Sequence, residues 1–411
     1  MRLSTFQFYQ NNLNNITGKS GQASQQLNQL SSGLRVQTAA DDPVAANGIL
    51  SYKQELERIA RYQSNISLGE NRLRREESVL TTAENLTQQV KELMLKANNG
   101  SYTQDERNAL ASELQSRMDE LLDLANSRDE FGNYIFAGFQ SDAAPFVRDP
   151  DGTVHYLGDG GQRELAVGDN VKVALNHDGR LVFGQVPNPR GDFTVQYRLE
   201  GEVREQGLVV ERARIEDKAA FGDAHPYSIT FSDSLSEPGR LALTLTDRDG
   251  TETGPMPYEP GAPVMVDGVS IVLKGEARAG DEITLNSTLA DGTGQDHVGL
   301  FDTMNRAMAW LRQDGNNASG QSELAEVLEQ LDGINGHLTR VRADTGIRLQ
   351  RLDNQKESHA DMSLTLEKVR SGMEDLDYAQ AIGELNQTMV ALQASQSVFG
   401  KLQGMSLFNY I

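Results

Sequence analysis

The stretch FQFYQNNLNNITGKSGQASQQLNQLSSGL (residues 6–34) carries apolar residues at alternating intervals of three and four positions. This spacing places them on one face of an α-helix and is typical of helices that pack along a seam. Its members are Phe6, Tyr9, Leu13, Ile16, Ala23, Leu27, Leu30 and Leu34, with one interruption at Ser20. The sequence therefore predicts an N-terminal helix that buries one long apolar face.

The C-terminal end of the chain repeats this pattern with very few charges. Residues 1–48 contain five charged side chains and residues 379–411 contain two, whereas a solvated helix usually has a charged outer face. We therefore predict that copies of the same chain cover both ends on more than one side. The residues expected at this assembly interface are Leu13, Ile16, Leu27, Leu30, Leu34, Leu385, Met389, Leu392, Phe399 and Leu407.

Length, charge and composition exclude several classes of protein. At 411 residues the chain is long enough for two or three domains. Its formal net charge of −21 argues against a nucleic-acid partner, because phosphate backbones require clustered Lys and Arg. The lack of cysteine excludes a disulfide framework and a thiolate metal site. The N-terminus has no apolar signal-peptide segment and no apolar run is long enough to span a membrane, so we expect no membrane insertion and no cleaved signal.

Two long helices are predicted inside the terminal seams. Residues 41–43 (Asp-Asp-Pro) offer an N-cap and a proline at the first helical position, so a helix should start there and continue to residues 98–100 (Asn-Asn-Gly). Thr103 and Glu106 have capping-box spacing ahead of a shorter amphipathic helix. A second long helix over residues 324–376 matches the first in length, as antiparallel partners require. We interpret the two long helices as an intramolecular coiled coil.

Between residues 141 and 290 the pattern changes to short alternating runs separated by glycine, proline and Asp-Gly turns, which predict β-hairpins. The expected strands are 153–157, 171–175, 193–199, 227–231, 241–246, 264–266, 269–273 and 282–286. The predicted fold is α+β: an elongated rod in which N- and C-terminal long helices pair in a coiled-coil bundle, with an inserted all-β domain. The predicted domains are 1–48 with 377–411 (terminal helical assembly domain), 49–140 with 291–376 (long-helix bundle) and 141–290 (β domain).

The sequence contains no convincing set of catalytic or metal-binding residues. Its six histidines form no pair at ligand spacing, and neither His-Glu-x-x-His nor Gly-x-Ser-x-Gly occurs. Residues 18–20 (Gly-Lys-Ser) resemble the end of a phosphate-binding loop, but Leu13 occupies the place of its first glycine. Asp247, Asp249 and Glu252 resemble a calcium loop without its bidentate glutamate, so a hairpin turn is the better interpretation. We predict neither an enzyme nor a cofactor.

Two motifs near the N-terminus resemble those of the bacterial flagellin family. Residues 29–36 (QLSSGLRV) and 39–43 (AADDP) are similar to the N-terminal signature of flagellins, and residues 89–93 (QVKEL) are similar to their next shared stretch. The resemblance covers about residues 1–140 and 290–411 well and the middle of the chain poorly. It implies a flagellin-like fold with paired terminal helices.

Further motifs resemble one branch of this family, the hook-associated proteins of the hook–filament junction. They are residues 1–5 (MRLST), 132–138 (GNYIFAG) and 406–411 (SLFNYI). The family motif residues in this chain are Ser31, Gly33, Arg35, Asp41, Asp42, Pro43, Phe136 and Gly138. This second resemblance implies a structural axial protein that joins hook to filament and adapts one to the other.

The resemblance also implies a location and a set of partners. Such proteins are secreted unfolded through the flagellar type III apparatus and become part of the extracellular flagellum. The implied partners are identical subunits in a ring, the hook-side junction protein, flagellin filament subunits, and a cytoplasmic export chaperone that binds about residues 372–411. The terminal helices would form the inner tube, the long-helix bundle the next layer, and the β domain the outer surface.

Three alternatives remain open from the sequence. A flagellin filament subunit would differ by propagating itself into long filaments. A glycan-binding adhesin would show saturable glycan binding by residues 141–290 alone. An enzyme would show a bound metal or turnover.

Overall fold

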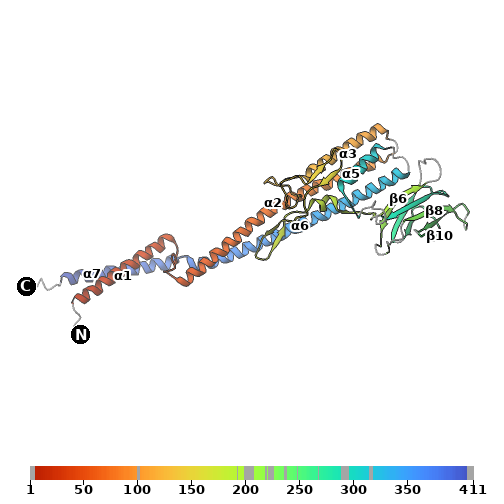
Figure 1. Ribbon diagram of the computed structural model, residues 1–411. Helices are drawn as coiled ribbons and strands as arrows, with labels where there is room; N and C mark the ends of the chain where they lie inside the picture. Colours follow the sequence, from red (N-terminus) through yellow and green to blue (C-terminus); the bar gives the residue numbers. More distant parts are fainter. Residues whose placement is uncertain are drawn as a thin grey trace, which may run out of the picture. The chain divides into compact units, whose positions relative to one another are not determined.

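The structure of the protein is a computed structural model, and the residues that it describes are 5–99, 102–191, 193–198, 208–217, 220, 226–235, 238–247, 249–266, 268–287, 296–313 and 318–404. Its helices are α1 (Thr5–Ser32), α2 (Pro43–Ala97), α3 (Gln104–Ala125), α5 (Leu300–Arg312), α6 (Ala318–Glu374) and α7 (Tyr378–Gly404), with a π-helical turn η1 (Arg180–Gly184). Long helices therefore stand at both ends of the chain, and a β-rich region is inserted between them (Figure 1). This arrangement confirms the predicted α+β fold class.

The inserted region contains short antiparallel strands. They are β1 (Phe146–Arg148), β2 (Val154–Tyr156), β3 (Glu164–Ala166), β4 (Lys172–Ala174), β5 (Val186–Pro187), β6 (Phe193–Arg198), β7 (Val209–Ile215), β8 (Tyr227–Asp233), β9 (Leu241–Thr246), β10 (Glu252–Pro257), β11 (Pro263–Val266), β12 (Val269–Lys274), β13 (Glu282–Ser287) and β14 (His297–Val298). The sequence predicted most of the longer strands. It missed β7, whose seven residues follow no simple apolar alternation, and β10, which contains Gly254 and Pro255.

Helices α2 and α3 start where the sequence predicts. Asp42 Oδ1 accepts hydrogen bonds from the backbone N–H groups of Val44 (3.1 Å) and Ala45 (3.0 Å). Pro43 is the first helical residue of α2, a position where its missing N–H removes no helical hydrogen bond. Helix α3 begins behind a capping box in which Thr103 and Glu106 exchange hydrogen bonds. Both helix starts are thus decided by local chemistry.

The chain divides into two compact units, each described by itself. The first consists of Met1–Ile66, Val167–Asp169 and Asp353–Ile411, and the second of Ser67–Ala166 and Asn170–Leu352. The long helices α2 and α6 contribute to both units. The three-domain division predicted from the sequence stays a prediction.

In the first unit, α1 and α7 lie side by side (Figure 1). An ion pair between Lys53 Nζ and Glu374 Oε1 (2.5 Å) connects the start of α2 to the end of α6, as expected for antiparallel helices. The segment 167–169 packs on the same two helices, because His359 Nε2 lies 2.7 Å from the Val167 carbonyl oxygen and Tyr62 stacks on His359. This unit has few large buried side chains away from the α2–α6 contact.

The second unit has a large apolar core built by four helices. Helices α2, α3, α5 and α6 supply most of its buried residues. Glu84 of α2 forms an ion pair with Arg342 of α6 (2.5 Å), and Lys91 pairs with Asp332 farther along, so the two helices are antiparallel here too. The predicted intramolecular pairing of the long helices is therefore confirmed within this unit.

The first part of the predicted β region shares this helical core. Phe146, Val182 and Phe183 are buried in it, and the ring of Phe183 lies 5.6 Å from that of Phe146 and 6.3 Å from that of Phe301 in α5. Aromatic pairs at these distances add to the stabilisation from area burial. Residues 178–179 (Asp-Gly), predicted as a hairpin turn, instead lead into the π-helical turn η1, so that expectation was wrong. The Asp-Gly turn residues do not indicate that this part of the β region packs into the helical core.

Strands β6 to β13 form a separate core. One sheet has the strand order β10-β9-β8-β13-β6 and a second has the order β11-β12-β7. Their inner faces share one buried apolar cluster, which includes Ile229, Ile271 and Ile283. Strand β5 pairs with β14, and the Asn188 N–H donates to the Asp296 carbonyl oxygen (2.9 Å), so the chain enters and leaves this β region at adjacent points.

These observations predict different outcomes for two deletions. Replacing residues 192–295 with a short Gly/Ser linker is expected to preserve the helical content, because the flanking residues 188 and 296 already touch. Replacing residues 141–290 removes Phe146 and Phe183 from the helical core, and each lost phenylalanine costs about 3–5 kcal/mol. Far-UV circular dichroism during thermal unfolding measures the difference. Equal loss of structure in the two variants would contradict this division of the cores.

Candidate functional site

The pairing of α1 with α7 (the terminal helix pair) buries only part of the assembly face that the sequence predicts on these two helices. Half-buried members are Ile16, Leu30, Leu34, Leu385, Leu392 and Phe399, whereas Leu13, Leu27 and Met389 are exposed. Leu407 lies outside the described residues. The structure thus brings the N-terminal and C-terminal seams together and leaves part of each unoccupied by the chain itself.

The exposed part of this face is strongly apolar. Leu27 retains 53% of its accessible surface, Met389 50% and Val390 68%. Burying such side chains would contribute about 25 cal/mol per Å² of apolar surface. A shallow groove of about 400 Å³ lies on α7. It is lined by Asn386, Gln387, Val390, Ala391 and Ala394.

A second candidate site lies where α1 turns into α2 beside the connection from α6 to α7. We call residues 33–42 and 373–378 the elbow. Backbone hydrogen bonds join the two segments of the elbow. The Leu376 N–H donates to the Gly33 carbonyl oxygen (2.9 Å), and the Arg35 N–H donates to the Glu374 carbonyl oxygen (2.7 Å). The elbow therefore joins the connection between α1 and α2 to the connection between α6 and α7 within the first unit.

The Arg35 side chain reinforces this connection. Its Nη2 donates to the Met373 carbonyl oxygen (2.7 Å), and its Nη1 lies 3.4 Å from Asp42 Oδ2. A cation is favourable at the C-terminal end of a helix, where unsatisfied carbonyl groups make the potential negative. Arg35 thus links the end of α6 to the residue that caps α2.

Asp41 and Asp42, on the N-terminal side of the elbow, accept hydrogen bonds from nearby backbone N–H groups. Asp41 Oδ2 accepts from the N–H groups of Thr38 (2.9 Å) and Gln37 (3.1 Å), and these bonds lower the pKa of Asp41. The pKa of Asp42 is lowered chiefly by the hydrogen bond from the Ala45 N–H. Both carboxylates are therefore charged at neutral pH, and their part in elbow stability is lost as pH falls through the depressed pKa values.

The C-terminal side of the elbow has its own cap. Asp377 Oδ1 accepts hydrogen bonds from the N–H groups of Ala379 (2.9 Å) and Gln380 (3.1 Å), so α7 begins directly after it. Gly33 has φ of 72°, and a Cβ there would lie 2.8 Å from the Tyr378 hydroxyl oxygen. A glycine is required at this position for both backbone conformation and space.

The helical ends that build both sites match known families. The profile of the bacterial flagellin N-terminal helical region matches residues 3–141, and that of the bacterial flagellin C-terminal helical region matches residues 328–411. The chain belongs to the bacterial flagellin family. Within it, the chain is 25% identical to flagellar hook-associated protein 3 of Salmonella typhimurium, over 99% of both chains.

Two further members of the flagellin family help to place the chain. Flagellin B of Vibrio anguillarum is 24% identical over 97% of this chain and 93% of its own length. The crystal structure of the flagellar junction protein FlgL from Legionella pneumophila superposes with a TM-score of 0.65 at 27% identity, covering 79% of this chain and all of that one. The chain is thus similar to both hook-associated proteins and filament flagellins.

Of the remaining flagellin-family motif residues, Phe136 and Gly138 lie in the second unit and Ser31 lies in the first. Phe136 is fully buried against Phe183, with ring centroids 5.2 Å apart. Gly138 has φ of 82°, and a Cβ there would lie 2.1 Å from Asp159 Oδ1, which accepts a hydrogen bond from the Phe139 N–H. Ser31 is exposed on the last turn of α1 in the first unit. The glycine and the phenylalanine thus act in packing, not in assembly chemistry.

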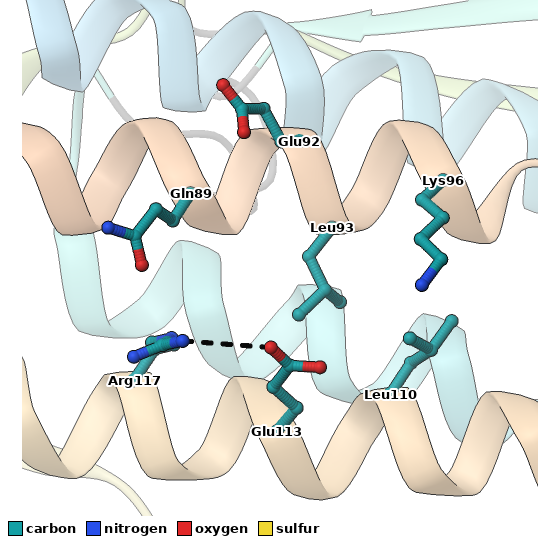
Figure 2. A pocket seen from close by; sticks show the side chains of 7 residues that line it. All are labelled: Gln89, Glu92, Leu93, Lys96, Leu110, Glu113 and Arg117. Carbon is teal, nitrogen blue, oxygen red and sulfur yellow. Dashed lines mark ion pairs between the residues drawn. The ribbon is translucent and has the colours of Figure 1, made fainter.

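The motif QVKEL (89–93) contributes to a small groove between α2 and α3 (Figure 2). The groove has a volume of about 240 Å³ and is lined by Gln89, Glu92, Leu93, Lys96, Leu110, Glu113 and Arg117. Its two acidic and two basic side chains balance, and Arg117 is 3.7 Å from Glu113 on its own helix. No nucleophile with a neighbouring base lines it, so this arrangement has no catalytic character.

Two further properties concern the part of the chain that the structure describes. Among these residues no group of three or more His, Cys, Asp or Glu side chains is placed to hold a metal ion. No helix within the described ranges combines the length and the apolar character needed to cross a bilayer. Asp247, which resembled a calcium ligand, instead accepts backbone hydrogen bonds from Asp249 and Thr251 in the β9–β10 turn.

The sequence reasoning missed the C-terminal half of the elbow. It predicted a boundary at residues 376–377 but assigned no role to Glu374, Asp377 or Tyr378. Asp377 does carry a local signal, since aspartate is a preferred N-cap residue and it stands directly before the first residue of α7. The partners of Gly33 and Arg35 could not be read in this way, because more than 330 positions separate them in the chain.

Replacing Gly33 with alanine is expected to loosen the terminal helix pair in this flagellin-family chain. A Cβ at positive φ costs about 1–2 kcal/mol and also meets the Tyr378 hydroxyl. The control is Gly21→Ala in the middle of α1, where nothing lies within 4 Å and alanine should stabilise by about 0.5–1 kcal/mol. Hydrogen exchange of α7 amides measures both changes. Equal protection in the two variants would contradict the role of Gly33.

Proposed function

We propose that this chain is a structural subunit of the flagellar axis at the junction between hook and filament. The observation that carries the proposal is the full-length match to flagellar hook-associated protein 3, which spans 99% of both chains. A structural role, not an enzymatic one, fits the relatives, which are named as flagellar components. The chain would act as part of the extracellular flagellum.

The terminal helix pair is the assembly surface in this proposal. The exposed side chains of Leu13, Leu27 and Met389 lie on helices that carry almost no charge. Identical subunits arranged in a ring would cover these side chains, as helices in a concentric tube do. The half-buried members of the predicted interface would then become fully buried by the neighbouring copies.

The specific partners are also proposals. Besides identical subunits, they are the hook-side junction protein on one side and flagellin filament subunits on the other. A cytoplasmic export chaperone would bind about residues 372–411, which include α7 and its apolar groove. Export would proceed through the flagellar type III apparatus.

The decisive experiment is a strain that lacks this protein. We expect its cells to make hooks but to release filament subunits into the medium, and the wild-type chain supplied from a plasmid to restore attached filaments. Electron microscopy of hooks and immunoblotting of the culture medium measure the two effects. Normal filaments in the deletion strain would contradict a junction role.

A flagellin filament subunit is the second candidate, because Flagellin B of Vibrio anguillarum also matches nearly the whole chain. The two functions differ in self-propagation. Purified filament subunits extend seeds into long filaments, whereas a junction subunit stops after a short ring. Seeded polymerisation followed by electron microscopy distinguishes them, and long filaments of this chain alone would favour the second candidate.

A further inference from the structure

A buried histidine in the second unit stands between carboxylates from both long helices. His177 follows β4, and its Nδ1 lies 2.8 Å from Glu76 Oε1 of α2. On the other side of the ring, Nε2 lies 2.9 Å from Asp344 Oδ2 of α6. The side chains of His177 and Glu76 are 5% and 2% exposed, whereas Asp344 is about half exposed.

This geometry decides the protonation of the ring. An ionised carboxylate only accepts hydrogen bonds, and a neutral imidazole has one N–H donor. With both carboxylates ionised, the two contacts are hydrogen bonds only when the ring carries two protons and a positive charge. The backbone N–H of His177 also donates to Glu76 Oε1 (3.0 Å), which holds the ring and this carboxylate in register.

The charge on His177 matters most to Glu76. Among the described residues, Glu76 Oε2 is buried without a hydrogen-bond partner, so the anion depends on His177 and on the more distant Arg72 for compensation. Arg348 of α6 already neutralises Asp344 from 2.7 Å. A buried carboxylate that loses its counter-charge is strongly unfavourable.

Some of the groups around His177 raise its pKa and others lower it. Burial alone would lower the pKa of His177, but hydrogen bonds and attraction from Glu76, with the hydrogen bond to Asp344, outweigh it and leave the pKa raised. Arg348 opposes this rise. His337 also interacts electrostatically with His177, and the pKa of His337 is lowered, chiefly by burial, so it is neutral at pH 7.

We propose that Glu76, His177 and Asp344 form a proton-dependent clamp that fastens the segment after β4 to both long helices, and that the clamp opens when His177 loses a proton. The clamp connects α2, α6 and the hairpin segment at one point, so its opening weakens the packing of the second unit. The sign follows from linkage. A raised histidine pKa stabilises the fold fully below the unfolded pKa of about 6.5, and this stabilisation is lost as pH rises through the folded pKa.

The direct test is the ring of His177 in the full chain labelled with ¹⁵N-histidine. We expect NMR to show both ring nitrogens protonated at low pH, with a titration midpoint above the ordinary histidine value of about 6.5. Asp344→Asn keeps the shape of the half-exposed partner and removes its charge, so it should move the midpoint of His177 to lower pH. A midpoint at or below about 6.5, or no shift in this variant, would overturn the clamp.

Stability measurements give an independent readout. The urea midpoint of the wild-type chain should fall as pH rises above about 6.5, and each pKa unit of elevation changes the unfolding equilibrium constant tenfold. His177→Gln should lose this pH-dependent part, whereas the control His155→Gln should retain it. If His177→Gln fails to fold, the ring titration of the wild type and of Asp344→Asn still decides. A pH dependence that is identical in His177→Gln would refute the proposal.

Discussion

Leu338→Glu is expected to unfold the second compact unit. Leu338 of α6 is fully buried in the core shared by the four helices. An unpaired charge in such a place costs several kcal/mol, and even Leu338→Ala should cost about 2–5 kcal/mol. Because a domain is stable by only about 5–15 kcal/mol, the glutamate variant should lose most of its cooperative thermal transition, and the alanine variant should melt about 5–15 °C lower.

The matched control for this prediction is Ile347→Glu, nine positions along the same helix. Ile347 retains 60% of its accessible surface, so a glutamate there stays solvated. We expect its melting temperature to remain within about 2 °C of the wild type, since surface substitutions usually change stability by less than 0.5 kcal/mol. Circular dichroism on both purified variants provides the measurement. Similar melting of Leu338→Glu and Ile347→Glu would show that the four-helix core is not packed as described.

Leu27→Glu and Met389→Glu are expected to abolish assembly without changing the stability of the monomer. Both side chains are at least half exposed on α1 and α7, so the new charge is solvated in the free subunit. In a contact between subunits the same charge would be buried without a partner, at several kcal/mol. Since 1.4 kcal/mol corresponds to a factor of ten, incorporation should fall by about 100-fold or more.

Secretion and incorporation are measured separately for these variants. Immunoblotting of the medium should detect stable secreted subunits, and immunogold labelling should find few at the hook tip. Leu27→Met and Met389→Leu are the controls, because they retain apolar character and should assemble normally. Charged variants that incorporate as well as these controls would remove the terminal helix pair from the assembly surface.

The Leu30 and Leu392 positions provide a useful contrast, because the sequence placed them in the same interface. Both are half-buried in the structure of the single chain. A charge at either position would therefore disturb the α1–α7 pair as well as any contact between copies. The exposed positions separate the two effects, and the sequence pattern alone did not distinguish them from the half-buried ones.

Much of the helical architecture could be predicted because it depends on near neighbours in the chain. The start of α2 needs only Asp42 and Pro43, and the start of α3 needs only Thr103 and Glu106. The turn of the β9–β10 hairpin was likewise decided by Asp247 and the residues just after it. In each case the controlling hydrogen bonds join groups no more than four positions apart.

The sequence by itself thus determined the helices other than α5, the α+β class, the family motifs and the weakly charged ends. Only the tertiary structure decided what covers each apolar face: the same spacing buries Leu73 in α2 and exposes Leu27 in α1. It also decided that Phe146 and Phe183 join the helical core, and it created the elbow and the His177 clamp. The physical reason is that burial and counter-charge come from distant partners: 101 positions separate His177 from Glu76, and 338 separate Arg35 from Met373.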